Sequence, residues 1–505
     1  MTHWCRKTLL LLGAATSMSL VWAGRDFTPL SGTWVIDAEL DGKPGRGLAI
    51  DVQGDTVVLQ VYGYESSGEA TFYMASGPMV GNGAVLSLQK FQGGTALGGP
   101  VRDAELAANM GEVQLQFANG VQGSIQLPGE PAYAMRRFVF NGQGDMSVPN
   151  PSQRFALAEL GSENQPLNLW FMDVVPTGLL TLRRPSPFAE WNLQCQPAND
   201  QGTVECISEA SSSTPRIRLS YQQFLYNASA LLEVDGEAAR RLVGAYMHTR
   251  TPAGIPTNGD RNWYSALQGF DAEQRLPEPG TWIMRDEKTG KPGRGISLDV
   301  QFGQALMQIF HYRPEGTATF HMGSGEFSQS RANIALKTYQ GGRYLGGPWQ
   351  PATEASDGGV AAINFDRLDS RKDMNEGSIR LAGEPLRVME RFEMQPTRPA
   401  LSSLMGDWVF SHSLSSKPKV VALNVVKGDV LTNAAGDFEC RFTPLLTDTV
   451  VDCSSTPSDG AQPERFSFPF SFQGRSAIRN SSYGIAFRVR DRLGNLTGMG
   501  PLVRP

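Results

Sequence analysis

Two copies of a Lys-Pro-Gly-Arg-Gly loop carry the charged residues best suited to binding an anion. Lys43 and Arg46 lie in the first copy, and Lys291 and Arg294 lie in the second. With glycine amides beside them, these side chains could hold a carboxylate, a phosphate or a sugar acid. The alternative is a plain turn with two solvated charges, because proline and glycine set the turn dihedrals. A phosphate loop is followed by a helix, whereas a strand pattern follows Arg46, so the turn is favoured.

Shared aromatic residues form a second candidate binding surface. Tyr64 and Tyr312 occupy equivalent positions in the two copies, and so do Phe72 and Phe320. A row of aromatic side chains could stack on sugar rings, although in strands such rows more often pack in the core or across strands. The two tyrosines join the four basic loop residues as the candidate ligand-binding set.

Paired carboxylates are the best candidates for catalysis. Asp51 matches Asp299 and Glu39 matches Glu287, and such pairs could perform acid–base chemistry or glycoside hydrolysis. However, Asp51 lies in an alternating strand, where we expect it on the solvent face. No H-E-x-x-H, G-x-S-x-G or Walker pattern occurs. We therefore name no catalytic residues, and the chain leans toward a protein that is not an enzyme.

Two histidines raise the question of a metal site. His311 and His321 lie on neighbouring predicted strands of the second copy and could approach each other as ligands. The first copy has Gly63 and Tyr73 at these positions, so such a site would be private to the second copy. Zinc needs a third protein ligand that the sequence does not identify. We therefore predict no metal and no cofactor.

Four cysteines beyond the N-terminal segment form two close pairs, Cys195 with Cys206 and Cys440 with Cys453. In an oxidising compartment such pairs become disulfides. A shared zinc site is the alternative, but neither pair has the short spacing that structural zinc sites use.

The N-terminus predicts export. Arg6 and Lys7 precede an uncharged apolar run over residues 8–20, and residues 21–23 offer small residues for cleavage. The run is shorter than the roughly 20 residues that span a bilayer, so we expect a cleaved signal, no integral membrane segment and a periplasmic or secreted protein. The net charge of −5 argues against nucleic-acid binding, which requires a basic surface.

An internal repeat must position these residues. Residues 32–100 and 280–348 align without a gap, with 31 of 69 pairs identical at a constant offset of 248. The match resumes at an offset of 254, up to Arg137 and Arg391, so six residues are inserted in the second copy. The cysteine pairs mark a second, weaker repeat. The predicted units are a signal peptide (1–23), A1 (24–145), B1 (150–260), A2 (275–396) and B2 (400–505).

Short alternating runs separated by turn signals predict strands throughout. In A1 they cover 32–38, 46–53, 56–64, 69–76, 84–91, 111–117, 122–127 and 132–140. In B1 they cover 167–175, 178–184, 190–196, 202–207, 215–223 and 239–248. Eight hairpin-linked strands can close into a small barrel. We predict an all-β protein in which two repeated eight-stranded meander or barrel-like units alternate with two smaller disulfide-stapled β units.

Each A unit begins with Gly-x-Trp, at Trp34 and Trp282, and ends with an arginine, Arg137 and Arg391. This pairing resembles the calycin signature of lipocalins and avidins, which implies that each tryptophan packs beneath the arginine as a structural clamp at the barrel base. The loops Lys-Pro-Gly-Arg-Gly and Leu-Gly-Gly-Pro are not part of that signature. The whole A unit more closely resembles the G-x-W β-meander repeats of secreted proteobacterial proteins, a resemblance that implies a fold and no activity.

Export, duplication and the absence of a catalytic motif favour a non-catalytic binding or envelope-associated protein. Its partner would be a glycan, an envelope component or another protein, and two linked sites would gain avidity. The alternatives are an extracytoplasmic hydrolase that uses the shared carboxylates and a structural subunit of a surface assembly.

Overall fold

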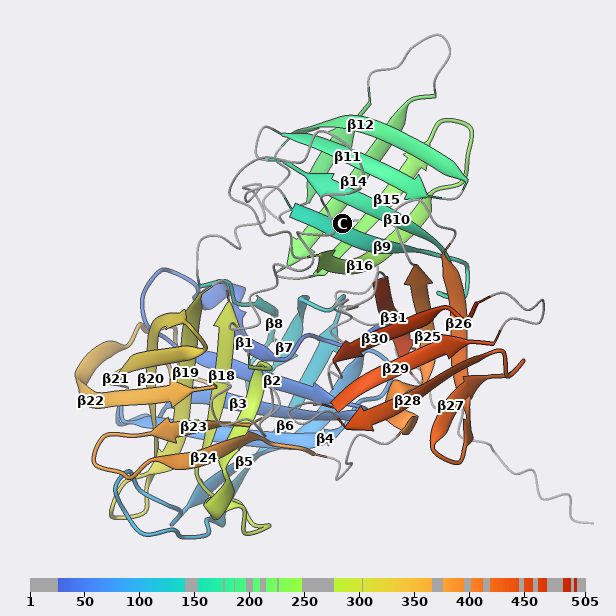
Figure 1. The fold of residues 1–505 in the computed structure, drawn as a ribbon. Helices are drawn as coiled ribbons and strands as arrows, with labels where there is room; N and C mark the ends of the chain where they lie inside the picture. Colours follow the sequence, from blue (N-terminus) through green and yellow to red (C-terminus); the bar gives the residue numbers. More distant parts are fainter. Residues whose placement is uncertain are drawn as a thin grey trace, which may run out of the picture.

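Strands account for almost all of the regular secondary structure in the described chain, and they form four sheets (Figure 1). The computed structural model describes residues 26–496 except for 141–152, 176–177, 186, 197–202, 209–214, 225–226, 248–276, 302, 366–375, 395–400, 412–417, 445–448, 457–461, 470–484 and 492–494. The predicted signal peptide, most of the linker residues and the six-residue insertion lie outside these ranges. Within them, no helix is long and apolar enough to cross a membrane.

The repeated A units have the predicted eight strands, paired in sequence order, and the structure shows that each unit closes into a barrel. A1 consists of β1 (Gly32–Ile36), β2 (Gly47–Gln53), β3 (Thr56–Tyr64), β4 (Ala70–Pro78), β5 (Gly83–Gln92), β6 (Glu105–Phe117), β7 (Gln122–Gln126) and β8 (Ala132–Arg137). A2 consists of β17 (Gly280–Met284), β18 (Gly295–Gln301), β19 (Gln304–Tyr312), β20 (Ala318–Ser328), β21 (Arg331–Gln340), β22 (Thr353–Asn364), β23 (Glu376–Arg380) and β24 (Arg387–Arg391). A short 3₁₀ turn follows the first strand in each, η1 (Asp37–Glu39) and η3 (Arg285–Glu287).

Apolar side chains fill both A barrels. Alternate residues of each strand point inward, and Trp34 packs edge-on against Phe117 at a centroid distance of 5.5 Å. Trp282 and Phe365 repeat this contact in A2 at 5.4 Å. The interior of each barrel is therefore a packed core along most of its length.

B1 is also a closed eight-stranded barrel. It consists of β9 (Gln153–Leu160), β10 (Pro166–Val174), β11 (Leu179–Pro185), β12 (Phe188–Gln196), β13 (Val204–Ile207), β14 (Ile217–Phe224), β15 (Asn227–Val234) and β16 (Arg240–Met247). The sequence predicted six of these strands and missed β9 and β15. Both are rich in alanine and leucine, which have little β propensity of their own, and barrel closure overrides that local preference.

B2 is a seven-stranded sheet in the order β30-β29-β28-β27-β26-β25-β31. Its strands are β25 (Gly406–Ser411), β26 (Lys419–Lys427), β27 (Val430–Asn433), β28 (Phe438–Pro444), β29 (Thr449–Ser455), β30 (Arg465–Pro469) and β31 (Ile485–Asp491), preceded by the 3₁₀ turn η4 (Leu401–Leu404). B1 and B2 pack on each other, because outward-facing Phe171 and Val243 of B1 share a buried apolar cluster with Val409 and Val489 of B2.

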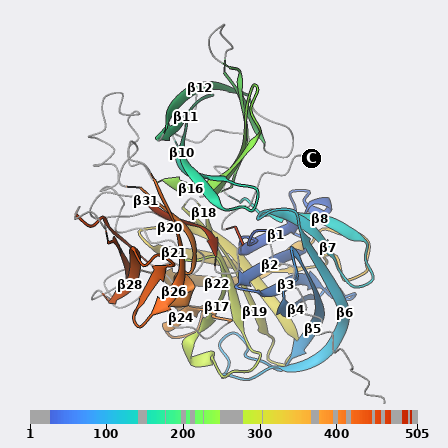
Figure 2. The same ribbon diagram turned by 90° about the vertical axis from the view of Figure 1, so that its right-hand side faces the viewer.

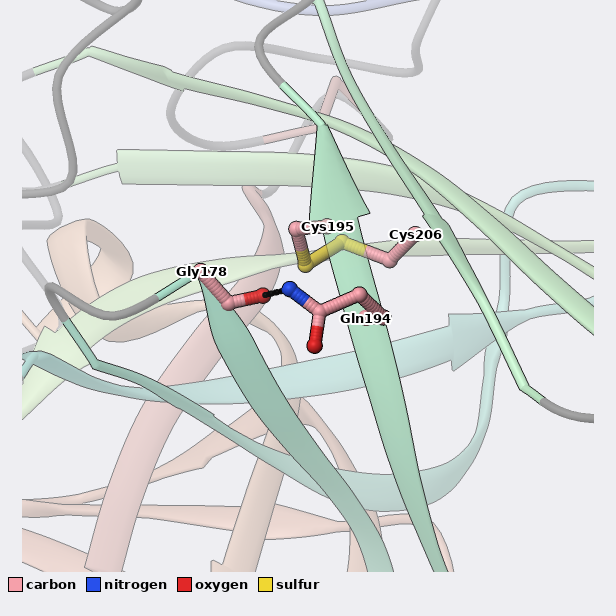
Figure 3. The surroundings of a disulfide bond; sticks show 4 residues. All are labelled: Gly178, Gln194, Cys195 and Cys206. Carbon is pink, nitrogen blue, oxygen red and sulfur yellow. Dashed lines mark hydrogen bonds between the residues drawn. A yellow bond between two sulfur atoms is a disulfide. The ribbon is translucent and has the colours of Figure 1, made fainter.

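Both predicted disulfides are confirmed. Cys195 on β12 lies directly opposite Cys206 on β13, and Cys440 on β28 lies directly opposite Cys453 on β29. Figure 3 shows the first pair beside the hydrogen bond from the Gln194 side chain to the Gly178 carbonyl, 3.3 Å long. Each disulfide thus joins two neighbouring strands of a B unit.

The two A barrels lie side by side and contact each other reciprocally (Figures 1 and 2). The amide of Gly93 donates to the Gly316 carbonyl, and that of Gly341 donates to Gly68, both at 2.8 Å. Likewise Ala104 N–H donates to Pro292 and Ala352 N–H to Pro44, at 2.7 and 2.8 Å. Each pair of contacts is related by the repeat offset, which is the pattern that an approximate twofold axis produces.

Aromatic side chains that the two copies share form the core of this interface. The apolar cluster between the barrels contains Tyr62, Tyr64, Phe72, Phe310, Tyr312 and Phe320. Tyr62 meets Phe320 edge-on at 5.4 Å, and Phe72 meets Phe310 at 5.3 Å. The outer faces of β3 and β4 and of their A2 equivalents are therefore covered by the partner barrel rather than by solvent.

Two crossed ion pairs lie in the same interface. Arg391 of A2 donates to Asp51 of A1 at 2.6 Å, and Arg137 of A1 donates to Asp299 of A2 at 2.5 Å. The expectation that Asp51 faces solvent is wrong, because its side chain is buried with a charged partner from the other barrel. Gly32 lies where the arginine passes, and an added Cβ would lie 2.1 Å from Arg137 Nη2.

The tryptophan and arginine of the predicted clamp are cross-strand neighbours in both A barrels. Trp34 is directly opposite Arg137, and Trp282 is directly opposite Arg391, on the strands that close each barrel. Each arginine then extends to the aspartate of the neighbouring barrel, while the Trp34 indole donates to the Leu30 carbonyl at 3.0 Å. The arginine therefore joins two barrels as well as closing one.

Removing a B1 disulfide should destabilise that barrel. Replacing Cys195 and Cys206 with serine frees a loop with a sequence separation of 11, and the chain-entropy model gives a loss of about 3 kcal/mol. Denaturant unfolding of the full chain measures the loss. An unchanged unfolding free energy would mean that the β12–β13 pairing is sufficient without the bond.

Breaking a crossed ion pair should lower the unfolding free energy more than breaking an exposed ion pair does. Asp51→Ala leaves Arg391 buried without its carboxylate, and we expect a loss of about 3–5 kcal/mol in unfolding free energy. Arg285→Ala, at a half-exposed ion pair with Glu390, is the matched control and should change it by less than about 1 kcal/mol. Equal losses in the two variants would contradict a structural role for Asp51.

Candidate functional site

The Lys-Pro-Gly-Arg-Gly loop of A1 places its arginine in a buried carboxylate cluster. Arg46 donates to Glu130 at 2.6 Å and, through Nε, to Glu39 at 3.1 Å. Arg343 of A2 enters the same cluster and donates to Glu39 at 2.8 Å. Burial alone would raise the pKa of Glu130, but hydrogen bonds from Arg46 and the Gly346 amide, with the charge of Arg343, hold it below its ordinary value.

The second copy has an equivalent cluster around Arg294, but its second arginine comes from a different position. Arg294 contacts Glu287 and donates to Glu384 at 2.5 Å. Its second arginine is Arg387, which comes from the same barrel and pairs with Glu287. Both clusters thus contain two glutamates and two arginines.

A pair of compensating differences between the copies explains this arrangement. The repeat offset of 248 places Thr95 at the position of Arg343, and the offset of 254 places Tyr133 at the position of Arg387. Arg343 stacks over the Tyr133 ring at 5.3 Å. Each cluster therefore keeps its second positive charge, supplied across the interface in one and from within the barrel in the other.

These clusters show where the predicted ligand-binding residues lie. Arg46 and Arg294 are buried with carboxylates of the protein, so their donors are already used. Tyr64 and Tyr312 are buried between the barrels. Lys43 and Lys291 remain exposed, and Lys291 lies 3.2 Å from Asp103. The structure does not bring the six residues into one site.

A cavity of about 760 Å³ opens instead at one end of the A2 barrel. Its walls are β19–β22 of A2 and two A1 segments, residues 67–70 and 96–97. His311 and Thr338 follow the core residues Ile309 and Leu336 by two positions, so they lie on the inward face. We call this cavity the A2 mouth.

The equivalent end of the A1 barrel has larger side chains at several positions. Tyr73 and Lys90 of A1 stand where A2 has His321 and Thr338, and Tyr344 of A2 stands at the position equivalent to Ala96 of A1. Tyr73 is buried in the A1 core, and Lys90 lies 2.6 Å from Glu65. The equivalent of His311 is a glycine, whose added Cβ would lie 3.5 Å from the Arg46 side chain. The A2 mouth is therefore a feature of the second copy.

His311 and His321 meet at the base of this mouth. The distance from His311 Nε2 to His321 Nδ1 is 2.6 Å, and His311 Nδ1 lies 3.0 Å from the Tyr312 carbonyl. A carbonyl only accepts, so His311 carries its proton on Nδ1 and its Nε2 accepts from His321 Nδ1. The remaining nitrogen, His321 Nε2, is then an acceptor on a half-buried ring that lines the cavity.

Burial keeps both rings neutral. It lowers the pKa of His311 to about 3, with a further decrease from the charge of His321, and it lowers the pKa of His321 as well. The predicted approach of the two histidines occurs, but no group of three or more metal-ligating side chains is found among the described residues.

Most residues of the A2 mouth were not predicted from the sequence. Ala96, Thr338 and Ser356 have no chemistry that marks them in isolation. The signal that could have found them is the difference between copies at positions where the rest of the repeat agrees.

Comparison with known proteins gives no matching family model, and no curated protein matches the chain. What the site can bind is therefore inferred from the residues that line it.

The pKa of His311 should lie far below that of free imidazole, and burial should lower the pKa of His321 as well. We expect His311 to remain neutral with its proton on Nδ1 at pH 5, because burial opposes the charge and the Tyr312 carbonyl accepts that proton. Nitrogen-15 NMR of the ring atoms measures tautomer and titration together. A transition of either ring near the ordinary value of about 6.5 would contradict the buried pair.

Proposed function

We propose that this protein is an exported, non-catalytic binding protein that holds a small polar ligand in the A2 mouth. The observation that carries the proposal is the cavity itself, whose 760 Å³ falls in the range of about 300–1,000 Å³ typical of small-molecule sites. A glycan or another envelope component is the ligand class that fits an exported protein.

Export is supported by the N-terminal signal pattern and by the two disulfides, which persist in oxidising compartments. The final location, in the periplasm or outside the cell, is part of the proposal.

The carboxylates offered for hydrolysis have other partners. Glu39 pairs with Arg46 and Arg343, and Asp51 pairs with Arg391. Neither carboxylate lines the A2 mouth. Both groups are buried and occupied by arginines of the protein, which favours binding over acid–base catalysis.

The difference between the mouths changes the expected stoichiometry. Duplication alone suggested two similar sites, but the equivalent end of A1 holds Tyr73, Tyr344 and the Lys90–Glu65 ion pair. We therefore propose one ligand per chain, bound by A2 and walled on one side by A1.

Closing the mouth should abolish binding. Ala96→Tyr introduces the residue that the equivalent loop position of A2 already carries, so the local backbone tolerates it. The ligands are first identified by screening the full mature chain on an array of envelope glycans. We expect Ala96→Tyr to bind these ligands with a Kd at least tenfold weaker. Isothermal titration calorimetry with those ligands measures the loss and the stoichiometry.

Tyr344→Ala is the matched control, since it changes the equivalent position at the other mouth. It should leave binding to the A2 mouth unchanged. Array ligands that bind Ala96→Tyr as well as the original protein would refute this site, and a wild-type chain that binds nothing on the array would refute the glycan-binding function.

A further inference from the structure

The A2 mouth presents one hydrogen-bond acceptor whose protonation is set by the fold. A chain of hydrogen bonds fixes this protonation. His321 Nδ1 donates to His311 Nε2, and His311 Nδ1 donates to the Tyr312 carbonyl. No partner of His321 Nε2 is found in the part of the chain that the structure describes. A ligand atom at this position must therefore be a donor.

The charges that line the mouth are paired within the protein. Arg313 of A2 lies 3.2 Å from Glu69 of A1, across the interface between the two barrels. Asp357 is paired with Lys337. The neutral imidazoles add no charge. Among the described residues that line the mouth, the positive group is therefore already paired and is not offered to an anion.

Hydroxyl and amide groups provide the rest of the polar lining. Thr338 lies 2.7 Å from Ser356, hydroxyl to hydroxyl, and both line the cavity with Gln340 and Thr353. The partly buried ring of Tyr339 adds an aromatic surface. Rings and hydroxyls together suit a molecule with an apolar face and several hydroxyl groups.

We infer that the A2 mouth recognises a neutral carbohydrate, and that a ligand hydroxyl donates its proton to His321 Nε2. This inference rests on the proposed binding function and adds the ligand class and the specificity-determining atom. His311 is a positioning residue, because it holds the His321 ring and its tautomer without reaching the ligand.

A metal ion is the main competitor for an unprotonated imidazole nitrogen. Zinc sites use at least three protein ligands, and no such group is found among the described residues. The ligand expected at this nitrogen is therefore a hydroxyl rather than a zinc ion.

Three sugar trimers of different charge test the ligand class. The probes are chitotriose for the neutral form, its deacetylated trimer for the cation and trigalacturonate for the anion, titrated by calorimetry into the full mature chain at pH 7. We expect the neutral trimer to bind at least tenfold tighter than either charged one. Tighter binding of trigalacturonate, or no binding of the neutral trimer, overturns the inference.

Substitution at His321 tests the recognition atom. His321→Phe keeps a planar ring and removes the acceptor, so binding of the neutral trimer should weaken at least tenfold, because the ligand hydroxyl loses its partner. Tyr73→Phe, at the equivalent position of A1, is the control and should bind normally. Thermal unfolding of each variant checks that it remains folded.

A ring measurement keeps the test independent of the variants. In the original protein, the nitrogen-15 shift of His321 Nε2 should move on adding chitotriose, while that of His311 Nδ1 stays. An unmoved Nε2 signal with bound trimer overturns the role of His321, and so does tight binding of Zn²⁺ alone at that nitrogen.

The two proposals fail in different ways. If Ala96→Tyr abolishes binding of an array ligand while His321→Phe does not, the A2 mouth is a binding site and the inference about His321 is wrong. If Ala96→Tyr has no effect, the binding site lies elsewhere.

Discussion

The crossed ion pairs, Asp51 with Arg391 and Asp299 with Arg137, are the interaction on which the arrangement of the two A barrels depends. Each arginine comes from the last strand of one barrel, directly opposite the tryptophan of its first strand, and it pairs with a carboxylate of the other barrel. A buried charge without a partner is strongly unfavourable. Neither barrel can therefore expose this face without a large cost, and the pair acts as a single unit. The glycine of each Gly-x-Trp motif makes room for this ion pair. A side chain at Gly32 would collide with Arg137, and one at Gly280 would collide with Arg391.

Duplication within one chain creates an interface like that of a symmetric dimer but allows its two halves to diverge. Residues that remain identical in both copies, such as Asp51 and Asp299 with Arg391 and Arg137, hold the barrels together. Where the copies differ, compensation is visible: Arg343 supplies across the interface the charge that Arg387 supplies within A2. The mouths have diverged without such compensation, since A1 is filled by Tyr73 while A2 carries His321. Structural constraint thus explains the shared positions, and the proposed function uses a position that only one copy has.

The strands of A1 and both disulfides could be predicted closely, because alternation, turn residues and cysteine spacing are local signals. Strands β9 and β15 could not, since their alanine and leucine residues carry no strong β preference and only barrel closure makes them strands. The loop arginine shows the same limit for the candidate site. The Lys-Pro-Gly-Arg-Gly pattern favoured a turn with two solvated charges, but Arg46 is buried. The carboxylates that it contacts are Glu39 nearby and Glu130, which lies far along the chain.

The sequence by itself determined the all-β class, the repeated units and the cysteine pairing, because each follows from residue patterns within a unit. Only the tertiary structure decided that Asp51 is buried, that the aromatic residues of β3 and β4 face another barrel, and that His311 and His321 stand at an open mouth. These features depend on contacts between residues separated by an entire unit. Burial, charge neutralisation and the imidazole acceptor at the A2 mouth are properties of that packing, and local spacing does not encode the distances that produce them.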